Sequence, residues 1–220
     1  MDDPEELKNA YPGWNSRGYL PHFDDGLKFQ FLTWRLADSL PARALERLSN
    51  EPPTPEGEAN YRRRLEQWLD AGHGSCVLRD PAVAGIVQGA CFYFAGERYE
   101  LHAWCIMPNH VHVLIHTIAP FTIVQIEHSW KSYTAHEINK ALKRSGKLWQ
   151  KDGWDRFIRD EKHYLRTVEY IEENPVKAKL CRGSSEWLWS SANAAAKEAL
   201  HARGTRALPA SLSIDDRKSR

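Results

Sequence analysis

Residues 101–116 constrain the fold of this chain more than any other segment, because they read as two strands joined by a tight turn. Residues 101–107 are mostly apolar, and residues 110–116 alternate histidine with aliphatic side chains for much of their length. Pro108 and Asn109, between the two runs, are residues that favour turns. Short alternating runs separated by a turn predict an antiparallel β-hairpin.

The remaining pattern places helices and one further strand around this hairpin. Alternating apolar and polar residues predict a half-buried strand over 27–36, and Trp187 and Trp189 are expected to close the core. Gly and Pro residues predict an irregular leader over 1–22 and a Pro-rich loop over 50–60. Helical periodicity and start signals predict helices near 41–49, 60–71, 81–95, 121–143 and 160–174.

The length and composition favour one folded domain. At 220 residues, with 42% hydrophobic and 27% charged residues, the chain has enough apolar side chains for its own core. We expect that domain to span residues 1–191, and a flexible tail to follow over 192–220.

No apolar run approaches the ~18 residues that suggest a membrane span, and the N-terminus is acidic, unlike a secretory signal. The four cysteines are scattered, without a CxxC pair. They predict reduced thiols in the cytoplasm and neither a disulfide framework nor a zinc site.

The charge is unevenly distributed, although the formal net charge is only +1. Residues 1–60 carry 6 Lys and Arg against 11 Asp and Glu, whereas residues 131–182 carry 13 against 8. A basic segment of this kind can bind a polyanion, and it can equally be a solvated surface of mixed charge.

The pair His110 and His112 is the first candidate site. Side chains two apart on a strand point to the same face, so both imidazoles should project together while Val111 and Val113 enter the opposite face. Two imidazoles on one rigid strand can serve as two nitrogen ligands of a divalent metal. The plainer interpretation is a pair of half-exposed histidines.

Tyr170 and Asn174 form the second candidate site. Four residues apart on a helix, they lie about 40° from each other, beside an apolar stripe that includes Val168 and Ile171. The tyrosine hydroxyl can face whatever packs against the helix, and the amide can offer an oxygen ligand. Alternatively, Tyr170 packs at the core edge and Asn174 caps a helix that ends before Pro175.

Together the two groups describe one chemistry. Two histidines and an amide oxygen can hold Mg²⁺ or Mn²⁺ with open positions, where a phosphodiester oxygen can be polarised. A nearby tyrosine can then attack phosphorus. Interleaved aromatic and basic residues are typical of single-stranded nucleic-acid binding, although the tryptophans are equally suited to a core. The candidates for contact with DNA are Lys131, Trp149, Lys151, Trp154, Arg156 and Arg159.

Five segments jointly resemble the REP-associated tyrosine transposases, a branch of the single-tyrosine transposases that carry an HUH motif. IMPNHVHVL at 106–114 is similar to the HUH motif, and YIEENPVKAKL at 170–180 is similar to the tyrosine helix. WQKDGWDRFIR at 149–159 resembles the region before that helix. RGYLPHF at 17–23 and SWKSYTA at 129–135 are also similar to the family.

The resemblance implies a ferredoxin-like (RRM-like) α+β fold with an antiparallel sheet, helices packed on one face, and the histidines on a central strand. It implies that Tyr170 is the nucleophile and that His110, His112 and Asn174 hold the metal. It also implies cleavage of single-stranded DNA at repeat hairpins through a 5′-phosphotyrosine, with a free 3′-OH released. Whether the protein is a monomer or a homodimer stays open.

Two other functions are compatible with the same residues. One is a catalytically idle protein that only binds single-stranded nucleic acid. The other is a metal-dependent nuclease in which water attacks and Tyr170 merely packs.

Overall fold

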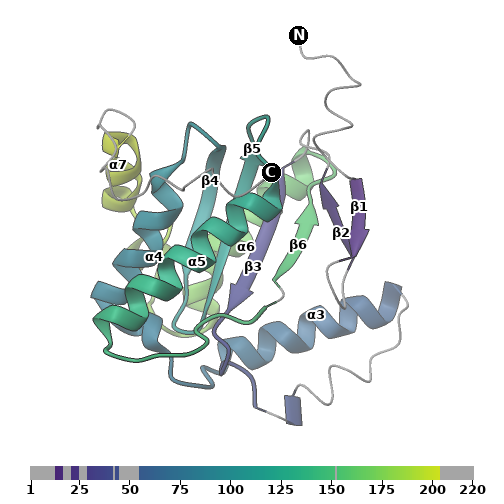
Figure 1. Cartoon of the computed structure of the whole chain (residues 1–220). Coiled ribbons are helices and arrows are strands. Elements are labelled where there is room, and N and C mark those ends of the chain that lie inside the picture. Colours follow the sequence, from purple (N-terminus) through teal and green to yellow (C-terminus); the bar gives the residue numbers. More distant parts are fainter. Residues whose placement is uncertain are drawn as a thin grey trace, which may run out of the picture.

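The computed structural model describes residues 13–16, 21–24, 29–41, 43–44, 55–151 and 153–203. Its centre is a four-stranded antiparallel sheet with strand order β4-β5-β3-β6, and helices lie on both sides of it (Figure 1). The predicted α+β class, and the position of the two histidines on an inner strand, are thereby confirmed. The strands of this sheet are β3 (Gln30–Arg35), β4 (Tyr99–Ile106), β5 (His110–Thr117) and β6 (Trp154–Phe157).

The predicted hairpin is formed by β4 and β5. Ile106 pairs with Val111, and the Met107 amide donates to the His110 carbonyl at 2.9 Å, which closes the turn. On its other side, β5 pairs with β3 so that Thr33 lies opposite His112. This register fixes which β3 side chain lies beside the second histidine.

Helices α4 (Pro81–Tyr93) and α5 (Ile123–Ala141) cover one face of the sheet. Each begins at a capped residue: the Asp80 side chain accepts from the Ala82 amide, and Thr122 forms a capping box with Gln125. Their apolar sides bury the alternate β5 residues Val111, Val113 and Ile115. This is the larger core, and its β5 residues are those predicted to point away from the histidines.

Helix α6 (Glu161–Lys177) lies across the opposite face, so the expectation that all helices pack on one face is wrong. The physical reason is that this second face is also apolar. Phe31, Cys105 and Leu114 are buried there against Ile171 of α6. An apolar sheet face left in water would cost free energy roughly in proportion to its area.

The helix also does not stop at Pro175, as the sequence predicted. It continues to Lys177, and Pro175 is buried within it. Proline removes one backbone donor, but the turn beyond it still forms: the Ala178 amide donates to the Asn174 carbonyl at 2.9 Å and the Leu180 amide to the Pro175 carbonyl at 2.8 Å. The chain leaves the helix at Lys179, whose φ of 58° is left-handed.

Helix α3 (Pro55–Asp70) begins inside the segment expected to be a Pro-rich loop. Pro55 is its first residue, a position where the missing N–H costs nothing. Leu65 and Leu69 pack with Leu40 and Ala44 in a small separate cluster. The prediction of a loop through residue 60 is therefore wrong, and the predicted helix starts earlier than its apolar pattern indicates.

The two ends of the domain also differ from expectation. Part of the expected irregular leader forms a two-stranded sheet of β1 (Gly13–Ser16) and β2 (Pro21–Asp24). Within the expected tail, α7 (Ala194–Arg203) is helical and buries Ala196 against the larger core. The rest of that tail and most of the helix expected near 41–49 lie outside the described residues.

The segment between α6 and α7 runs beside β4. It contains the short 3₁₀ helix η2 (Ser184–Glu186). A second 3₁₀ helix, η1 (Val77–Arg79), precedes α4. The Ile106 amide donates to the Trp189 carbonyl and the Ser191 amide to the Trp104 carbonyl, both at 2.9 Å. Trp187 and Trp189 pack against the two opposite cores, as expected of residues that close them. No helix in the described ranges has the length and apolar character to cross a membrane.

Candidate active site

His110 and His112 lie side by side on β5 and face α6. Their ring centroids are 4.7 Å apart, and the side chains are only 1% and 2% exposed. The interpretation as half-exposed surface histidines therefore does not hold. Burying two imidazoles next to each other requires that their polar atoms find partners.

One nitrogen of each ring has such a partner. The Nδ1 of His110 lies 2.7 Å from the Asn109 Oδ1, and the Nδ1 of His112 lies 2.7 Å from the Thr33 hydroxyl. The amide nitrogen of Asn109 donates to the carbonyls of Leu69 and His73, which fixes its oxygen as an acceptor. Nδ1 of His110 therefore carries the proton, and its Nε2 keeps a free lone pair.

Burial determines the charge of the pair. Removal from water lowers the pKa of His110 to about 3. Burial also lowers the pKa of His112 well below its ordinary value, and the neighbouring His110 adds to this effect. Both rings are neutral at pH 7, which is the form that binds metal ions.

Two buried polar atoms at this site have no hydrogen-bond partner: Nε2 of His112 and Oδ1 of Asn174. An unpartnered buried polar atom costs free energy unless something else satisfies it. An imidazole nitrogen and an amide oxygen are ligands that suit a divalent cation. No cluster of three His, Cys, Asp or Glu residues that could hold a metal occurs in the part of the chain described here, and Asn174 could supply a third donor beside the two histidines.

Tyr170 of α6 completes the group. Its ring centroid lies 5.6 Å from that of His112 and 5.8 Å from that of Phe31, and the Lys177 ammonium lies 4.9 Å from the ring centre. Burial, followed by the charge of Glu66, raises the pKa of Tyr170 far above its ordinary value, while a hydrogen bond from Asn174 opposes the shift. The two predicted pairs, one on β5 and one on α6, are thus brought together.

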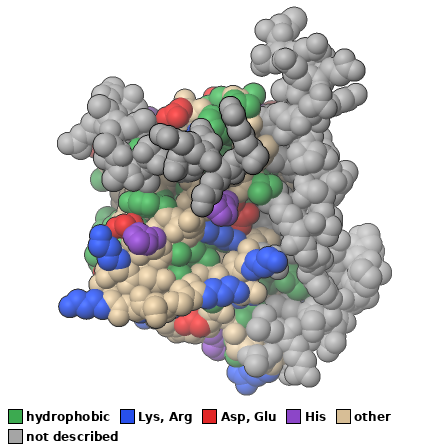
Figure 2. Space-filling model, in the orientation of Figure 1, with side chains coloured by type: hydrophobic (Ala, Val, Ile, Leu, Met, Phe, Trp, Pro, Cys, Tyr) green, Lys and Arg blue, Asp and Glu red, His purple; other side chains and the backbone are tan. Residues whose placement is uncertain are grey.

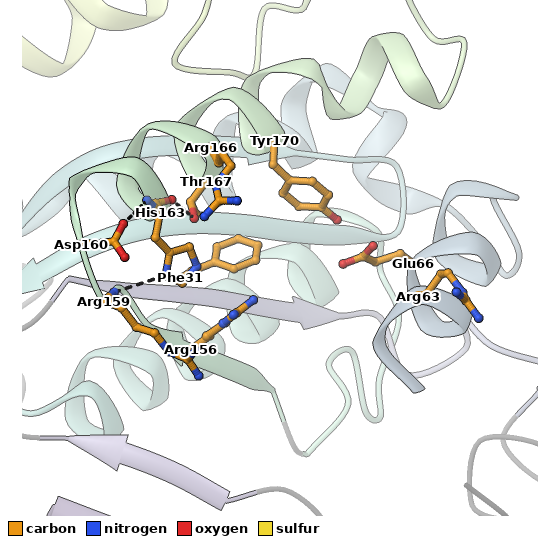
Figure 3. Close-up of a pocket in the computed structure, with 10 residues that line it drawn as sticks. All are labelled: Phe31, Arg63, Glu66, Arg156, Arg159, Asp160, His163, Arg166, Thr167 and Tyr170. Carbon is orange, nitrogen blue, oxygen red and sulfur yellow. Dashed lines mark hydrogen bonds between the residues drawn. The ribbon is translucent and has the colours of Figure 1, made fainter. Parts of the chain in front are cut away.

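A pocket of about 600 Å³ opens beside the tyrosine (Figure 3). Phe31 forms part of its wall, and Tyr170 and Glu66 face each other across one end. Arginine is the dominant charged residue of its lining, and a cluster of arginines is suited to bind phosphate groups. The arginines are Arg63 of α3, Arg156 of β6, Arg159 in the turn after it, and Arg166 of α6.

The structure separates the six predicted DNA-contacting residues. Arg156 and Arg159 line the pocket beside Tyr170. Lys131 and Lys151 line a different hollow against α5, where Lys131 pairs with Glu127 at 2.6 Å. The side chain of Trp154 lies outside the described part of the chain.

Trp149 lines the same hollow, but it is buried and offers no exposed ring for base stacking, which corrects that prediction. It is 5% exposed, and its indole nitrogen donates to the Thr134 hydroxyl at 2.8 Å. Its apolar ring contributes to the larger core, the alternative that the sequence left open. In Figure 2 the Lys and Arg side chains of the visible face are separated by other residues and do not form one patch.

Sequence reasoning missed several residues of this site, among them Thr33, Arg63, Glu66, Asn109 and Arg166. Asn109 directly precedes the histidine pair, so its adjacency was a usable signal. Thr33 becomes visible only through the β3–β5 register. Arg63 and Glu66 belong to α3, whose position against α6 is a tertiary property.

The fold and site define a class of protein in which a histidine pair on an inner strand faces a tyrosine helix. Residues 86–174, which contain both elements, match the family described as "Transposase IS200 like". This match confirms the resemblance indicated by the sequence motifs.

The relatives agree with this assignment. The REP-associated tyrosine transposase of Escherichia coli K12 is 30% identical over 95 residues, which is 42% of this chain and 53% of that protein. A relative from Haemophilus influenzae is 28% identical over 103 residues, 42% of this chain and 58% of its own. The chain therefore spans little more than half the length of the curated relatives it matches.

A solved structure extends the likeness to the whole fold. A REP-associated tyrosine transposase bound to a REP hairpin covers 94% of this chain and 97% of its own, with a TM-score of 0.53 and 18% identity. At this identity the match supports the fold alone.

Proposed function

We propose that this protein is a DNA strand transferase that cleaves and rejoins single-stranded DNA at repeat hairpins, with Tyr170 as the nucleophile. The observation that carries the proposal is the position of Tyr170, against His112 and at the mouth of an arginine-lined pocket. The family match over residues 86–174 and the transposase relatives support a transposase function.

In this mechanism each residue has a distinct task. Arg156, Arg159 and Arg166 bind the phosphates of the strand and orient one phosphodiester toward Tyr170. The tyrosine hydroxyl attacks phosphorus, forms a 5′-phosphotyrosine and releases a 3′-OH. Because the phosphotyrosine conserves the energy of the broken bond, a second 3′-OH can reverse the step without ATP.

His110, His112 and Asn174 are the residues that would hold Mg²⁺ or Mn²⁺. The neutral imidazoles and the two unpartnered buried atoms fit such an ion. When bound, the metal would polarise a non-bridging oxygen of the phosphodiester and so help charge develop at phosphorus. Asn109 and Thr33 hold the two rings in the orientation that this requires.

We propose single-stranded DNA with a hairpin as the substrate. A stiff duplex is harder to fit between a sheet face and a helix than a flexible strand. The structural neighbour is a transposase bound to a REP hairpin, which suggests the same class of partner for this chain. Action on such DNA would place the protein in the cytoplasm.

A denaturing gel tests the proposal. The protein is mixed with labelled single-stranded hairpins and Mn²⁺, and a band of protein covalently joined to DNA is expected. Tyr170→Phe should abolish that band and leave DNA binding on a native gel within a few-fold of wild type. Tyr164→Phe is the matched control, since that hydroxyl contacts His102 instead, with 3.1 Å between the two atoms. Its band should persist.

The same gel distinguishes the two alternatives. Binding without any covalent band would indicate an idle binding protein. Cleaved strands that persist in Tyr170→Phe and disappear in His110→Ala would indicate a nuclease that uses water.

A further inference from the structure

Helix α3 contributes a carboxylate to the site, although it lies before the region that matches the transposase family. Glu66 lines the arginine pocket, and in Figure 3 its carboxylate points toward the hydroxyl of Tyr170. The contact includes a hydrogen bond between the two side chains. Asp70, one helical turn further along α3, acts on Tyr170 through its charge only.

The position of Glu66 is held from two sides. Leu65 and Leu69 are 9% and 2% exposed, and both pack in the small cluster under α3. The Asn109 amide donates to the Leu69 and His73 carbonyls at the end of that helix. Since Asn109 also bonds to His110, one side chain links the helix that carries Glu66 to the strand that carries the histidines.

A carboxylate is an unfavourable residue in a pocket that binds phosphates, because like charges repel. Its placement at the tyrosine therefore calls for a function that its charge serves. Metal binding does not supply one, since no cluster of three His, Cys, Asp or Glu was found among the described residues. Hydrogen bonding to the hydroxyl of Tyr170 does.

We infer that Glu66 is the group that accepts the proton of Tyr170 during strand cleavage, an inference that rests on the proposed function. A tyrosine has an ordinary pKa near 10, so at neutral pH the hydroxyl must lose its proton as it attacks. The bond from Oη to phosphorus forms, the bond from phosphorus to O3′ breaks, and the proton of Oη passes to a Glu66 oxygen. The leaving O3′ takes a proton from water and becomes the 3′-OH.

Rejoining reverses these transfers. The attacking 3′-OH releases its proton to water and the bond from phosphorus to Oη breaks. Glu66 then returns its proton to the tyrosine oxygen. One carboxylate thus acts as base in cleavage and as acid in rejoining, which suits an enzyme that must do both at a single tyrosine.

Glu66→Gln tests the inference, because it keeps the shape of the side chain and removes the proton acceptor. We expect single-turnover formation of the covalent DNA adduct to slow by about 10²-fold or more. Hairpin binding should stay within a few-fold, which also shows that the variant folds. Asp70→Asn is the matched control, because Asp70 carries the same charge on the same helix but makes no hydrogen bond to Tyr170. It should slow adduct formation by less than a tenth of the factor expected for Glu66→Gln.

A more acidic nucleophile separates proton transfer from simple positioning. Trifluorotyrosine at position 170, whose hydroxyl loses its proton more readily, should restore most of the lost rate in Glu66→Gln. If trifluorotyrosine does not restore the rate lost in Glu66→Gln, the inference is wrong. It is also wrong if Glu66→Gln forms the adduct as fast as wild type does. If wild type itself forms no adduct, the proposed function fails instead, so the two failures are distinguishable.

Discussion

At the scale of single residues, the site depends on side chains that orient other side chains. Thr33 and Asn109 each bond the Nδ1 of a histidine and so determine where its Nε2 points. Partners of this kind commonly contribute 10-fold to 100-fold in metal affinity. The orientation of the two rings is therefore set by the residues that bond to them.

Thr33→Val should therefore weaken binding of Mn²⁺ by about 10-fold to 100-fold, measured by titration calorimetry on the purified protein. Valine keeps the shape of threonine but leaves Nδ1 of His112 without its bond. Thr117→Val is the matched control, because that buried β5 hydroxyl has no hydrogen-bond partner. Equal affinity in both variants would show that Thr33 does not orient the ring.

At the scale of elements, helix α6 holds the nucleophile against the sheet through one apolar side. Ile171, next to Tyr170, is fully buried against the second core, while Leu165 on the same helix is 59% exposed. Docking of the tyrosine helix thus depends on a narrow apolar stripe.

Ile171→Ala should lower the free energy of unfolding by about 2–5 kcal/mol, since it removes buried methylene and methyl groups and leaves a cavity. Leu165→Ala, with its side chain already in water, should change it by less than about 0.5 kcal/mol. Urea denaturation of both variants measures the difference. A similar loss in the two would mean that α6 is not held by this stripe.

The elements also show what the sequence alone could determine. The alternation of residues 110–116 predicts both the strand and the face of each histidine, because strand periodicity is a local property. Thr33 and Glu66 could not be found this way. Their places follow from the β3–β5 register and from the packing of α3, which no single segment encodes.

Helix ends show a similar limit. Pro175 predicts a stop because proline breaks most helices, but here it falls in the last turn and the helix continues. Pro55 and Gly57 indicate a loop by composition, yet Pro55 suits the first position of α3. In both cases the position of the proline within the helix decides its effect.

At the scale of the whole molecule, the buried histidines couple the site to stability. The unfolded chain binds a proton at each histidine below its ordinary pKa near 6.5, whereas burial lowers the pKa of folded His110 to about 3. Between these two values the unfolded state therefore binds more protons than the folded state. Acid should destabilise the metal-free protein as the pH falls below about 6.5.

The expected slope is about 1.4 kcal/mol per pH unit for each histidine kept neutral by the fold. Urea denaturation in a chelator at pH 7, 6 and 5 measures it. His110→Gln should reduce the slope by the contribution of one histidine, about 1.4 kcal/mol per pH unit, because glutamine does not titrate. His136→Gln, which replaces an exposed histidine, is the matched control. If the slope of His110→Gln equals that of wild type, the protonation of this buried site does not limit the acid stability of the fold.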